Sequence, residues 1–200
     1  MEERHYFTDN RDLPSHRREI TYSTGEQTWT FVTDDGVFSK LEVDRGTQVL
    51  LKAVREEQLS GRVLDMGCGY GVIAVAVKTM FPETEVTAAD INPRALGLCQ
   101  ENALRSRTEV VTVLSDGFSA IQGAYRAVLT NPPIRAGKAV IYGMFRDSYE
   151  HLEQGGFLLA VIRRKQGAES ARNYLAELFG TCSVVLREKG YWVLKCIRTD

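Results

Sequence analysis

From Arg62 onward, short apolar runs alternate with longer segments whose apolar residues recur at helical spacing. Short apolar runs between polar or glycine residues are typical of buried strands, and a period near 3.6 residues is typical of helices. The apolar runs predict seven strands, at residues 63–66, 85–90, 109–114, 126–130, 157–163, 182–186 and 191–197. The intervening helices are predicted at residues 72–80, 93–105, 138–154 and 169–179. Such alternation implies a parallel sheet that is covered on both faces.

Two short links complete this predicted fold. Gly155-Gly156 is predicted to close the helix 138–154, because glycine is common just after the end of a helix. The link Glu188-Lys189-Gly190 between the last two strands predicts a hairpin, so the last strand should run antiparallel. We therefore expect a Rossmann-like α/β fold: a mostly parallel seven-stranded sheet with an antiparallel C-terminal hairpin and helices on both faces.

The first sixty residues follow a different pattern. Residues 19–23 and 28–33 are predicted as two strands, Asp34-Asp35-Gly36 as a turn, and residues 47–57 as an amphipathic helix. Residues 1–60 are thus expected to form an N-terminal extension, a β-hairpin plus a helix, that packs on the domain formed by residues 61–200.

Composition and charge indicate a soluble globular protein. Apolar residues make up 44% of the chain, charged residues 26%, and the net charge of −1 provides no global basic field for nucleic acid. The start of the sequence lacks an apolar signal segment, and no apolar run is long enough for a membrane. Four cysteines without metal-ligand spacing indicate a reduced, cytoplasmic protein without a metal site. Contacts with RNA would then come from local basic patches, namely Arg4, Arg11, Arg17 and Arg18, and the run Arg163-Arg164-Lys165.

A glycine-rich turn follows the first parallel strand, with the sequence Gly67-Cys68-Gly69-Tyr70-Gly71. Such a turn lets backbone approach a nucleoside cofactor. It does not match the dinucleotide pattern G-x-G-x-x-G, because residue 72 is Val. Asp65, just before the turn, would repel a pyrophosphate but suits a ligand that carries an ammonium and a sulfonium.

Acidic residues also end the next two strands. Asp90 is placed to accept hydrogen bonds from both ribose hydroxyls, and Asp116 to accept one from an adenine amino group. A helix cap at Asp90 and an Asx-turn at Asp116 are the alternative structural roles. The predicted cofactor-binding residues are Asp65, Gly67, Gly69, Gly71, Asp90, Ile91, Asp116 and Gly117.

The fourth strand runs into Asn131-Pro132-Pro133. An exocyclic amine is a poor nucleophile because its lone pair is delocalised, so a catalyst must hold its N–H groups and turn the lone pair out of the ring plane. The Asn131 side-chain oxygen and the Pro132 carbonyl could accept these protons, while Pro133 keeps Pro132 extended. The alternative is a Pro-Pro stop after a strand. Together with the glycine turn, the loop predicts methyl transfer from S-adenosylmethionine to an exocyclic nitrogen, with Asn131, Pro132 and Pro133 as catalytic residues.

These motifs resemble those of class I methyltransferases that modify amino groups: residues 65–71, Asp90 and Asn131-Pro132-Pro133-Ile134. Residues 31–39, 44–47 and 164–168 are similar to the catalytic domain of the small-subunit ribosomal RNA guanine-N2 methyltransferases (the RsmC-like family). The resemblance covers the chain from about Phe31. It implies S-adenosylmethionine as cofactor, N2 of a guanine in small-subunit ribosomal RNA as acceptor, and ribosomal RNA or a small-subunit particle as partner.

The sequence departs from this family in two ways. Longer members carry an additional N-terminal domain that helps with substrate recognition, and these 200 residues are not expected to include one. Family loops often place an aromatic residue after Asn-Pro-Pro, where this chain has Ile134 and forgoes stacking worth roughly 1–3 kcal/mol. Phe38 or another N-terminal aromatic residue is expected to replace it. The predicted substrate-binding residues are Phe38, Ile134, Arg163, Arg164 and Lys165.

Other functions stay open at this point. The acceptor could be another amide or amino nitrogen, such as adenine N6 or a protein glutamine, and the chain could be a catalytically weak RNA-binding module. Val72 and Asp65 disfavour a dehydrogenase. His5, His16 and His151 are interpreted as solvated or packing residues rather than catalysts.

Overall fold

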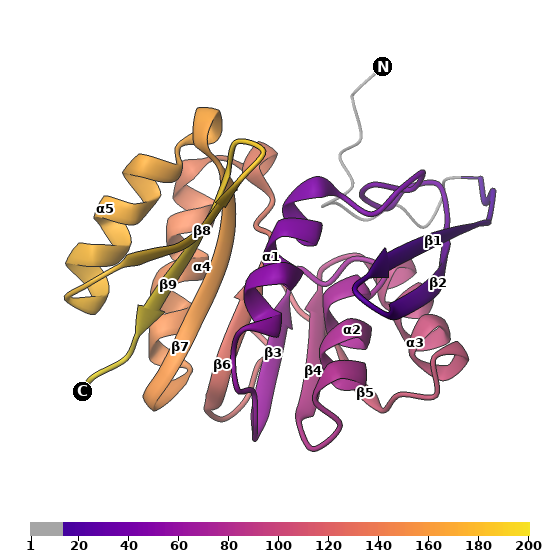
Figure 1. The fold of residues 1–200 in the computed structure, drawn as a ribbon, viewed down its shortest axis with the longest axis horizontal. Helices are drawn as coiled ribbons and strands as arrows, with labels where there is room; N and C mark the ends of the chain where they lie inside the picture. The colour runs from indigo at the N-terminus through magenta and orange to yellow at the C-terminus, as the bar shows by residue number, and fades with distance from the viewer. Residues whose placement is uncertain (1–13) are drawn as a thin grey trace.

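The computed structural model describes residues 14–200, and Figure 1 shows the course of the chain. The strands are β1 (Arg18–Thr24), β2 (Gln27–Thr33), β3 (Arg62–Met66), β4 (Glu85–Asp90), β5 (Val110–Leu114), β6 (Tyr125–Thr130), β7 (Leu152–Arg163), β8 (Ser183–Glu188) and β9 (Tyr191–Ile197). The helices are α1 (Arg45–Arg55), α2 (Val72–Met80), α3 (Pro93–Arg105), α4 (Lys138–Glu150) and α5 (Ala168–Phe179), with 3-10 turns η1 (Ile134–Ala136) and η2 (Arg164–Gln166). Within residues 14–200, no helix has the length and apolar character needed to cross a membrane.

Seven strands form one sheet in the order β5-β4-β3-β6-β7-β9-β8. The strands from β5 to β7 are parallel, and β9 runs antiparallel to both of its neighbours, β7 and β8. The expected fold class is therefore confirmed, including the C-terminal hairpin. In this order β3 lies between β4 and β6, so the strand order reverses direction at β3. The connections that follow β3 and β6 therefore lead to opposite sides of the sheet. A crevice at the carboxyl ends of these strands is the expected ligand site of an open α/β sheet.

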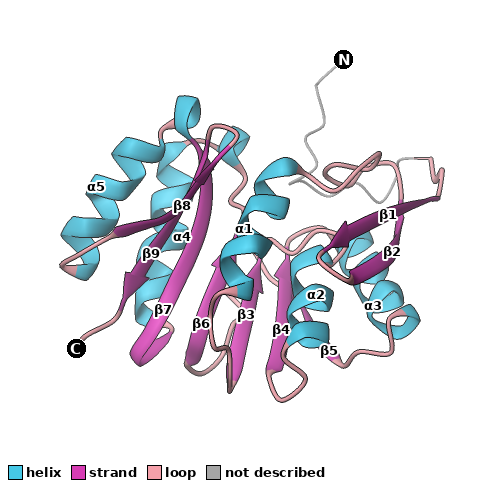
Figure 2. Cartoon of the chain, viewed as in Figure 1, coloured by secondary structure: helices cyan, strands magenta, loops and turns pink. Residues whose placement is uncertain are grey.

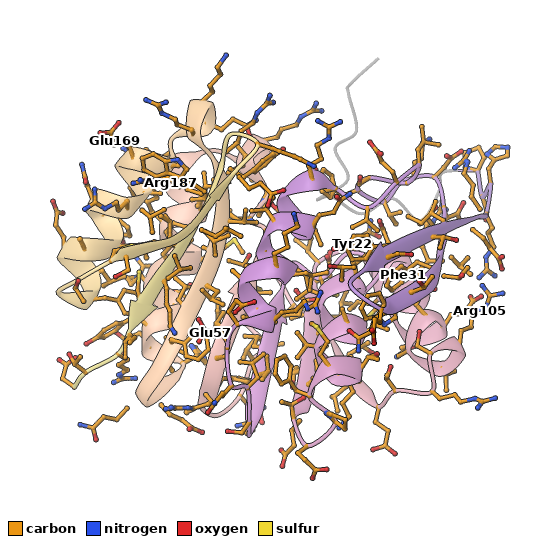
Figure 3. The ribbon with its side chains drawn as sticks, in the orientation of Figure 1. Tyr22, Phe31, Glu57, Arg105, Glu169 and Arg187 are labelled. Carbon is orange, nitrogen blue, oxygen red and sulfur yellow. The ribbon has the colours of Figure 1, made fainter. Side chains whose placement is uncertain are left out.

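Helices cover both faces of the sheet (Figure 2). Helices α1, α2 and α3 pack on one face in a core that also includes the β1–β2 hairpin, and α4 and α5 pack on the other face. Tyr22 and Phe31 belong to the first core (Figure 3), where the Phe31 ring centre lies 6.1 Å from that of Tyr70. The N-terminal hairpin thus shares its core with the helices that flank the glycine turn.

Asn102 on α3 attaches the hairpin to this core. Its fully buried side chain accepts from the Val32 amide (2.7 Å) and donates to the Val32 carbonyl (3.0 Å) and the Tyr70 carbonyl (2.8 Å). Leaving one of these buried groups unpaired would cost about 1–3 kcal/mol. One amide therefore fixes β2 and the glycine turn to the same helix.

Three predicted helix boundaries are wrong by two residues or more: the end of the helix 138–154 and both ends of the helix 47–57, which spans Arg45–Arg55. Helix α4 ends at Glu150 rather than at residue 154, and Gly155 and Gly156 lie inside β7. The Arg198 guanidinium donates to three carbonyls at this point (2.7–3.3 Å), so a side chain from the far end of the chain caps the helix. Helix α1 begins at Arg45 rather than at residue 47, because the Asp44 side chain caps it.

Candidate active site

A cavity of about 780 Å³ opens at the carboxyl ends of β3, β4 and β6. The glycine turn and the loops after β4, β5 and β6 form its walls, together with residues 37–47 of the N-terminal segment and one side of α4. Ten of the sequence-predicted site residues line it: Phe38, Gly67, Gly69, Asp90, Ile91, Asp116, Gly117, Asn131, Pro132 and Pro133.

The glycine turn presents bare backbone to the cavity. Gly67 (φ 74°) and Gly69 (φ 55°) adopt left-handed conformations, and a Cβ on either would meet nothing within 4 Å. Glycine is needed there for conformation and for close approach of a ligand. A Cβ on Gly71 would instead lie 2.6 Å from the Cys99 sulfur, so this glycine lets α2 pack tightly on α3.

Asp65 is buried behind the glycine turn. One carboxylate oxygen accepts from the Ala74 amide in α2 (3.0 Å), and the other has no hydrogen-bond partner among the described residues. Burial raises the pKa of Asp65 to about 8, and the charge of nearby Asp90 adds to the rise. An unpaired buried acceptor of this kind suits a donor from a bound ligand.

Asp90 supports the turn from the end of β4. Its carboxylate accepts from the Gly69 amide (2.8 Å) and the Asn92 amide (2.9 Å), while burial raises its pKa. The alternative role as a helix cap is not needed, because the Asn92 side chain itself accepts from the Arg94 amide (3.0 Å) at the start of α3. Asp90 therefore both orders the glycine turn and faces the cavity.

The turn after β5 places Asp116 and Gly117 on the opposite wall. The Ser115 hydroxyl donates to the Gly117 carbonyl (2.7 Å) and accepts from the Ala120 amide (3.0 Å). In the described structure, hydrogen bonds of the Ser115 side chain thus hold this turn, and the Asp116 side chain is exposed beside the cavity.

The Asn-Pro-Pro loop meets the start of α1. The Asn131 side-chain nitrogen donates to the Asp44 carboxylate (2.9 Å) and to the Thr47 hydroxyl (3.0 Å). Because the side-chain nitrogen of Asn131 points toward α1, its side-chain oxygen points away from α1 and can accept a hydrogen bond. Pro132 is buried, and the Pro133 carbonyl accepts from the Ala136 amide (2.8 Å), which closes η1 and fixes the loop.

Asp44 and Thr47 are site residues to which the sequence analysis assigned no role. Both line the cavity, although they lie more than eighty residues before Asn131. In the sequence, the run at residues 44–47 shows a family resemblance but no sign of this contact. An acid followed by a helical pattern is a recognisable N-cap signal, but its contact with the distant loop is visible only in three dimensions.

The other six predicted site residues do not line the cavity formed by residues 14–200. These are Asp65, Gly71, Ile134, Arg163, Arg164 and Lys165. Ile134 packs half-buried against the second core. The three basic residues are exposed where β7 ends, beside the β8–β9 turn, since the Arg164 amide donates to the Gly190 carbonyl (2.8 Å).

The N-terminal basic patch and the histidines have structural contacts where they are described. Arg17 pairs with Glu101, and Arg18 with Asp35 at 3.0 Å. His16 lies 2.7 Å from the Asp35 carboxylate, and the His151 ring packs on Phe118 at the edge of the cavity. Arg4, His5 and Arg11 lie outside the described residues. Residues 14–200 contain no group of three or more potential metal ligands.

The strand order and the position of the cavity define the class of protein. A seven-stranded sheet with one antiparallel strand inserted beside the last parallel one is the fold of class I methyltransferases, whose cofactor is S-adenosylmethionine. The open glycines and the unpaired Asp65 oxygen fit that cofactor. The methyltransferase small domain model matches residues 28–195, and the chain belongs to this family.

Individual relatives agree with this assignment. The chain is 41% identical over 194 residues to the uncharacterized protein YbxB of Bacillus subtilis, a match that covers 96% of each chain. It is 33% identical over 162 residues to the ribosomal RNA small subunit methyltransferase C of Shewanella amazonensis, covering 79% of this chain and 46% of that protein. The chain thus spans about half the length of the ribosomal RNA methyltransferases it matches.

Solved structures are similar as well. The T. thermophilus 16S rRNA N2 methyltransferase RsmC, in complex with AdoMet and guanosine, has a TM-score of 0.83 at 26% identity. That match covers 93% of this chain and 52% of RsmC. The ribosomal protein L11 methylase of Lactobacillus delbrueckii shares the fold, with a TM-score of 0.67 at 18% identity over 82% of this chain and 89% of its own.

Proposed function

We propose that this chain transfers the methyl group of S-adenosylmethionine to N2 of a guanine in small-subunit ribosomal RNA. One observation is the main support for an amino group as the methyl acceptor. The Asn131 side-chain nitrogen is held by Asp44 and Thr47, so the side-chain oxygen is the group available to an incoming amine. The relatives named as small-subunit methyltransferases, and the guanosine in the RsmC complex, support guanine as the base.

On the cofactor side, the bound S-adenosylmethionine supplies an electrophilic methyl group on its sulfonium. The backbone of Gly67 and Gly69 lets it approach closely, and Asp90 accepts from its ribose hydroxyls. Asp65 offers its unpaired oxygen toward the amino group, and Asp116 accepts from the adenine amine. These residues bind and orient, and none of them touches the acceptor.

On the acceptor side, Asn131 and Pro132 hold the base. The Asn131 oxygen and the Pro132 carbonyl accept the two N–H groups of the exocyclic amine, which turns the lone pair out of the ring plane. Prolines have no amide N–H, so the loop offers no donor that would compete for that lone pair. Alignment of this kind can supply roughly 7–11 kcal/mol.

RNA would reach the cavity across exposed groups at its rim. Phe38 lines the cavity and is 38% exposed, and we assign it to stacking on a base. Arg163, Arg164 and Lys165 follow β7 at the same end of the sheet as the cavity, and we assign them to phosphate contacts. Ile134 packs beneath the loop rather than on the base.

The test is methyl transfer in vitro. The purified chain is incubated with methyl-labelled S-adenosylmethionine and, separately, with small-subunit particles, free 16S ribosomal RNA and a protein extract, and the products are digested for mass analysis. N2-methylguanosine in the RNA is the expected product. Label in adenine or in peptides would contradict the guanine assignment, and cofactor binding without transfer to any acceptor would favour an RNA-binding module.

A further inference from the structure

We propose that Asp44 is a positioning residue for the reaction: with Thr47 it fixes the Asn131 amide so that its oxygen, not its nitrogen, faces the acceptor amine. This inference rests on the proposed function. Asp44 belongs to the N-terminal segment and caps α1, whereas Asn131 directly follows β6. The contact therefore joins the segment before the sheet to the loop that holds the acceptor.

The charge of Asp44 decides the orientation of the amide. A single carboxylate oxygen accepts from the Gly46 amide (2.7 Å), the Thr47 amide (3.2 Å) and the Asn131 side-chain nitrogen (2.9 Å). Rotating the amide by half a turn would bring its oxygen against this carboxylate and leave two acceptors in contact. Hydrogen bonds to an ionised group are also stronger than neutral ones, so the carboxylate holds the nitrogen and leaves the oxygen toward the cavity.

Gly46 provides independent support. A Cβ at this position would lie 2.8 Å from the Asp44 carboxylate, 3.1 Å from the Tyr191 ring and 3.4 Å from the Asn131 side-chain nitrogen. Only a residue without a side chain leaves room for these groups to meet. The run Asp44-Arg45-Gly46-Thr47 thus supplies two acceptors and the space between them, which a helix cap alone would not require.

The experiment distinguishes two roles of Asp44: capping α1 and accepting a hydrogen bond from the Asn131 side chain. Asp44→Ser keeps a capping oxygen for α1 but is too short to reach Asn131, whereas Asp44→Asn keeps both length and an acceptor. Thr47→Val removes only the second acceptor. Gln48→Ala is the matched control, because Gln48 donates to the Val43 carbonyl (2.7 Å) at the same helix end without touching Asn131. For each variant we measure the melting temperature, S-adenosylmethionine affinity by calorimetry, and kcat and KM with small-subunit particles.

We expect Asp44→Ser to lower kcat by roughly 10- to 100-fold, below the loss for a whole preorganised group. Cofactor affinity and the KM for particles should stay within about 2-fold of the parent, and Gln48→Ala should retain the parent kcat. Asp44→Asn should recover only part of the loss, because it keeps an acceptor of the right length but not the charge. In an Asn131→Ala background, Asp44→Ser should lower kcat no further, because the group it positions is gone.

The outcomes are distinguishable. If Asn131→Ala loses turnover while Asp44→Ser and Thr47→Val keep the parent kcat, the positioning role is refuted and the proposed function stands. If the two losses multiply in the double variant, Asp44 acts independently of Asn131, which also refutes the role. If Asn131→Ala itself keeps the parent kcat, the proposed mechanism fails and this inference fails with it. Should Asp44→Ser not fold, Thr47→Val decides, since it leaves Asp44 and the cap in place.

Discussion

The two halves of the cavity are assembled in different ways. Most of the cofactor half comes from the continuous β3–α2–β4 unit, where Asp65, the glycine turn and Asp90 lie within 26 residues of one another. The Asp90 carboxylate accepts from the Gly69 amide, and the Asp65 carboxylate accepts from the Ala74 amide in α2. The acceptor half joins Asp44 and Thr47 to Asn131, more than eighty residues away. Residues that bind the cofactor can therefore lie close together in the sequence. The position of Asn131, which contacts the acceptor in the proposed mechanism, depends instead on residues brought together by the tertiary fold. Substitutions in the two halves should therefore separate binding from turnover.

The largest expected effect is in the acceptor half. Asn131→Ala should lower kcat by on the order of 10²–10³, as removal of one preorganised polar group does in other active sites. Cofactor affinity should stay within about 2-fold, because the hydrogen bonds of this side chain go to Asp44 and Thr47 rather than to a predicted cofactor residue. Calorimetry and steady-state turnover measure the two, and Asn173→Ala on the exposed face of α5 is the control. If Asn131→Ala lowered S-adenosylmethionine affinity as much as turnover, the proposed separation of binding and turnover between the two halves would be wrong.

The reciprocal change is in the cofactor half. Asp90→Ala removes the acceptor for the Gly69 amide and for the ribose hydroxyls, and it should weaken S-adenosylmethionine binding by about 1.5–3 kcal/mol. Turnover at saturating cofactor should recover to near the parent value. Glu85→Ala, at the opposite end of the same strand, should leave affinity unchanged. Failure of saturating cofactor to restore turnover would show that Asp90 acts beyond binding.

A smaller effect concerns the rim. Replacing Arg163, Arg164 and Lys165 together with Ala should weaken RNA binding and reduce the slope of log K against log salt by roughly 0.7–0.9 per lost phosphate contact. Filter binding across a salt series measures this slope. Arg105→Ala with Arg107→Ala, at the C-terminal end of α3, removes two positive charges elsewhere on the surface and should change the slope less per charge removed. Equal slopes in both sets would remove the basic run from the RNA surface.

A further effect is a pH dependence of stability that only the cofactor half should show. Because burial raises the pKa of Asp65 to about 8, the folded chain retains a proton there that the unfolded chain loses near pH 4. The contribution to stability is thus present at low pH and is lost as the pH rises toward about 8. Thermal melts of the cofactor-free chain should show a smaller fall over this range for Asp65→Asn. Asn131→Ala should keep the parent profile, and a parent-like profile for Asp65→Asn would contradict the assignment.

The same contrast explains what the sequence could predict. Apolar patterning located all seven strands of the sheet, since burial on both faces leaves near-continuous apolar runs in inner strands such as β3 and β6. The edge strands β5 and β8 are only partly buried, but they still carry several apolar residues. The end of α4 was missed because its cap, Arg198, comes from the end of the chain, and the glycines thought to close the helix instead sit in β7. A Cβ on Gly156 would lie 2.9–3.0 Å from three carbonyl oxygens, so that glycine marks close strand packing.

Within the site, residue type alone did not distinguish residues that face the cavity from residues that pack behind it. Gly67, Gly69 and Gly71 share a motif, yet only the first two face the cavity while Gly71 packs on Cys99. Asp44 was visible only as part of a family-like run, since its bond to Asn131 depends on where α1 lies across the sheet. Six of the eight predicted cofactor residues thus line the cavity, whereas Asp44 and Thr47, which bond to Asn131, were not among the predicted site residues.

The measurement that most directly tests the account is a comparison of small-subunit ribosomal RNA nucleosides from cells with and without this gene, with the deletion complemented by the parent or by Asn131→Ala. The account predicts that one N2-methylguanosine is lost on deletion, returns with the parent chain, and does not return with the Asn131→Ala variant at equal protein level. An unchanged N2-methylguanosine content on deletion, or full restoration by Asn131→Ala, would contradict it.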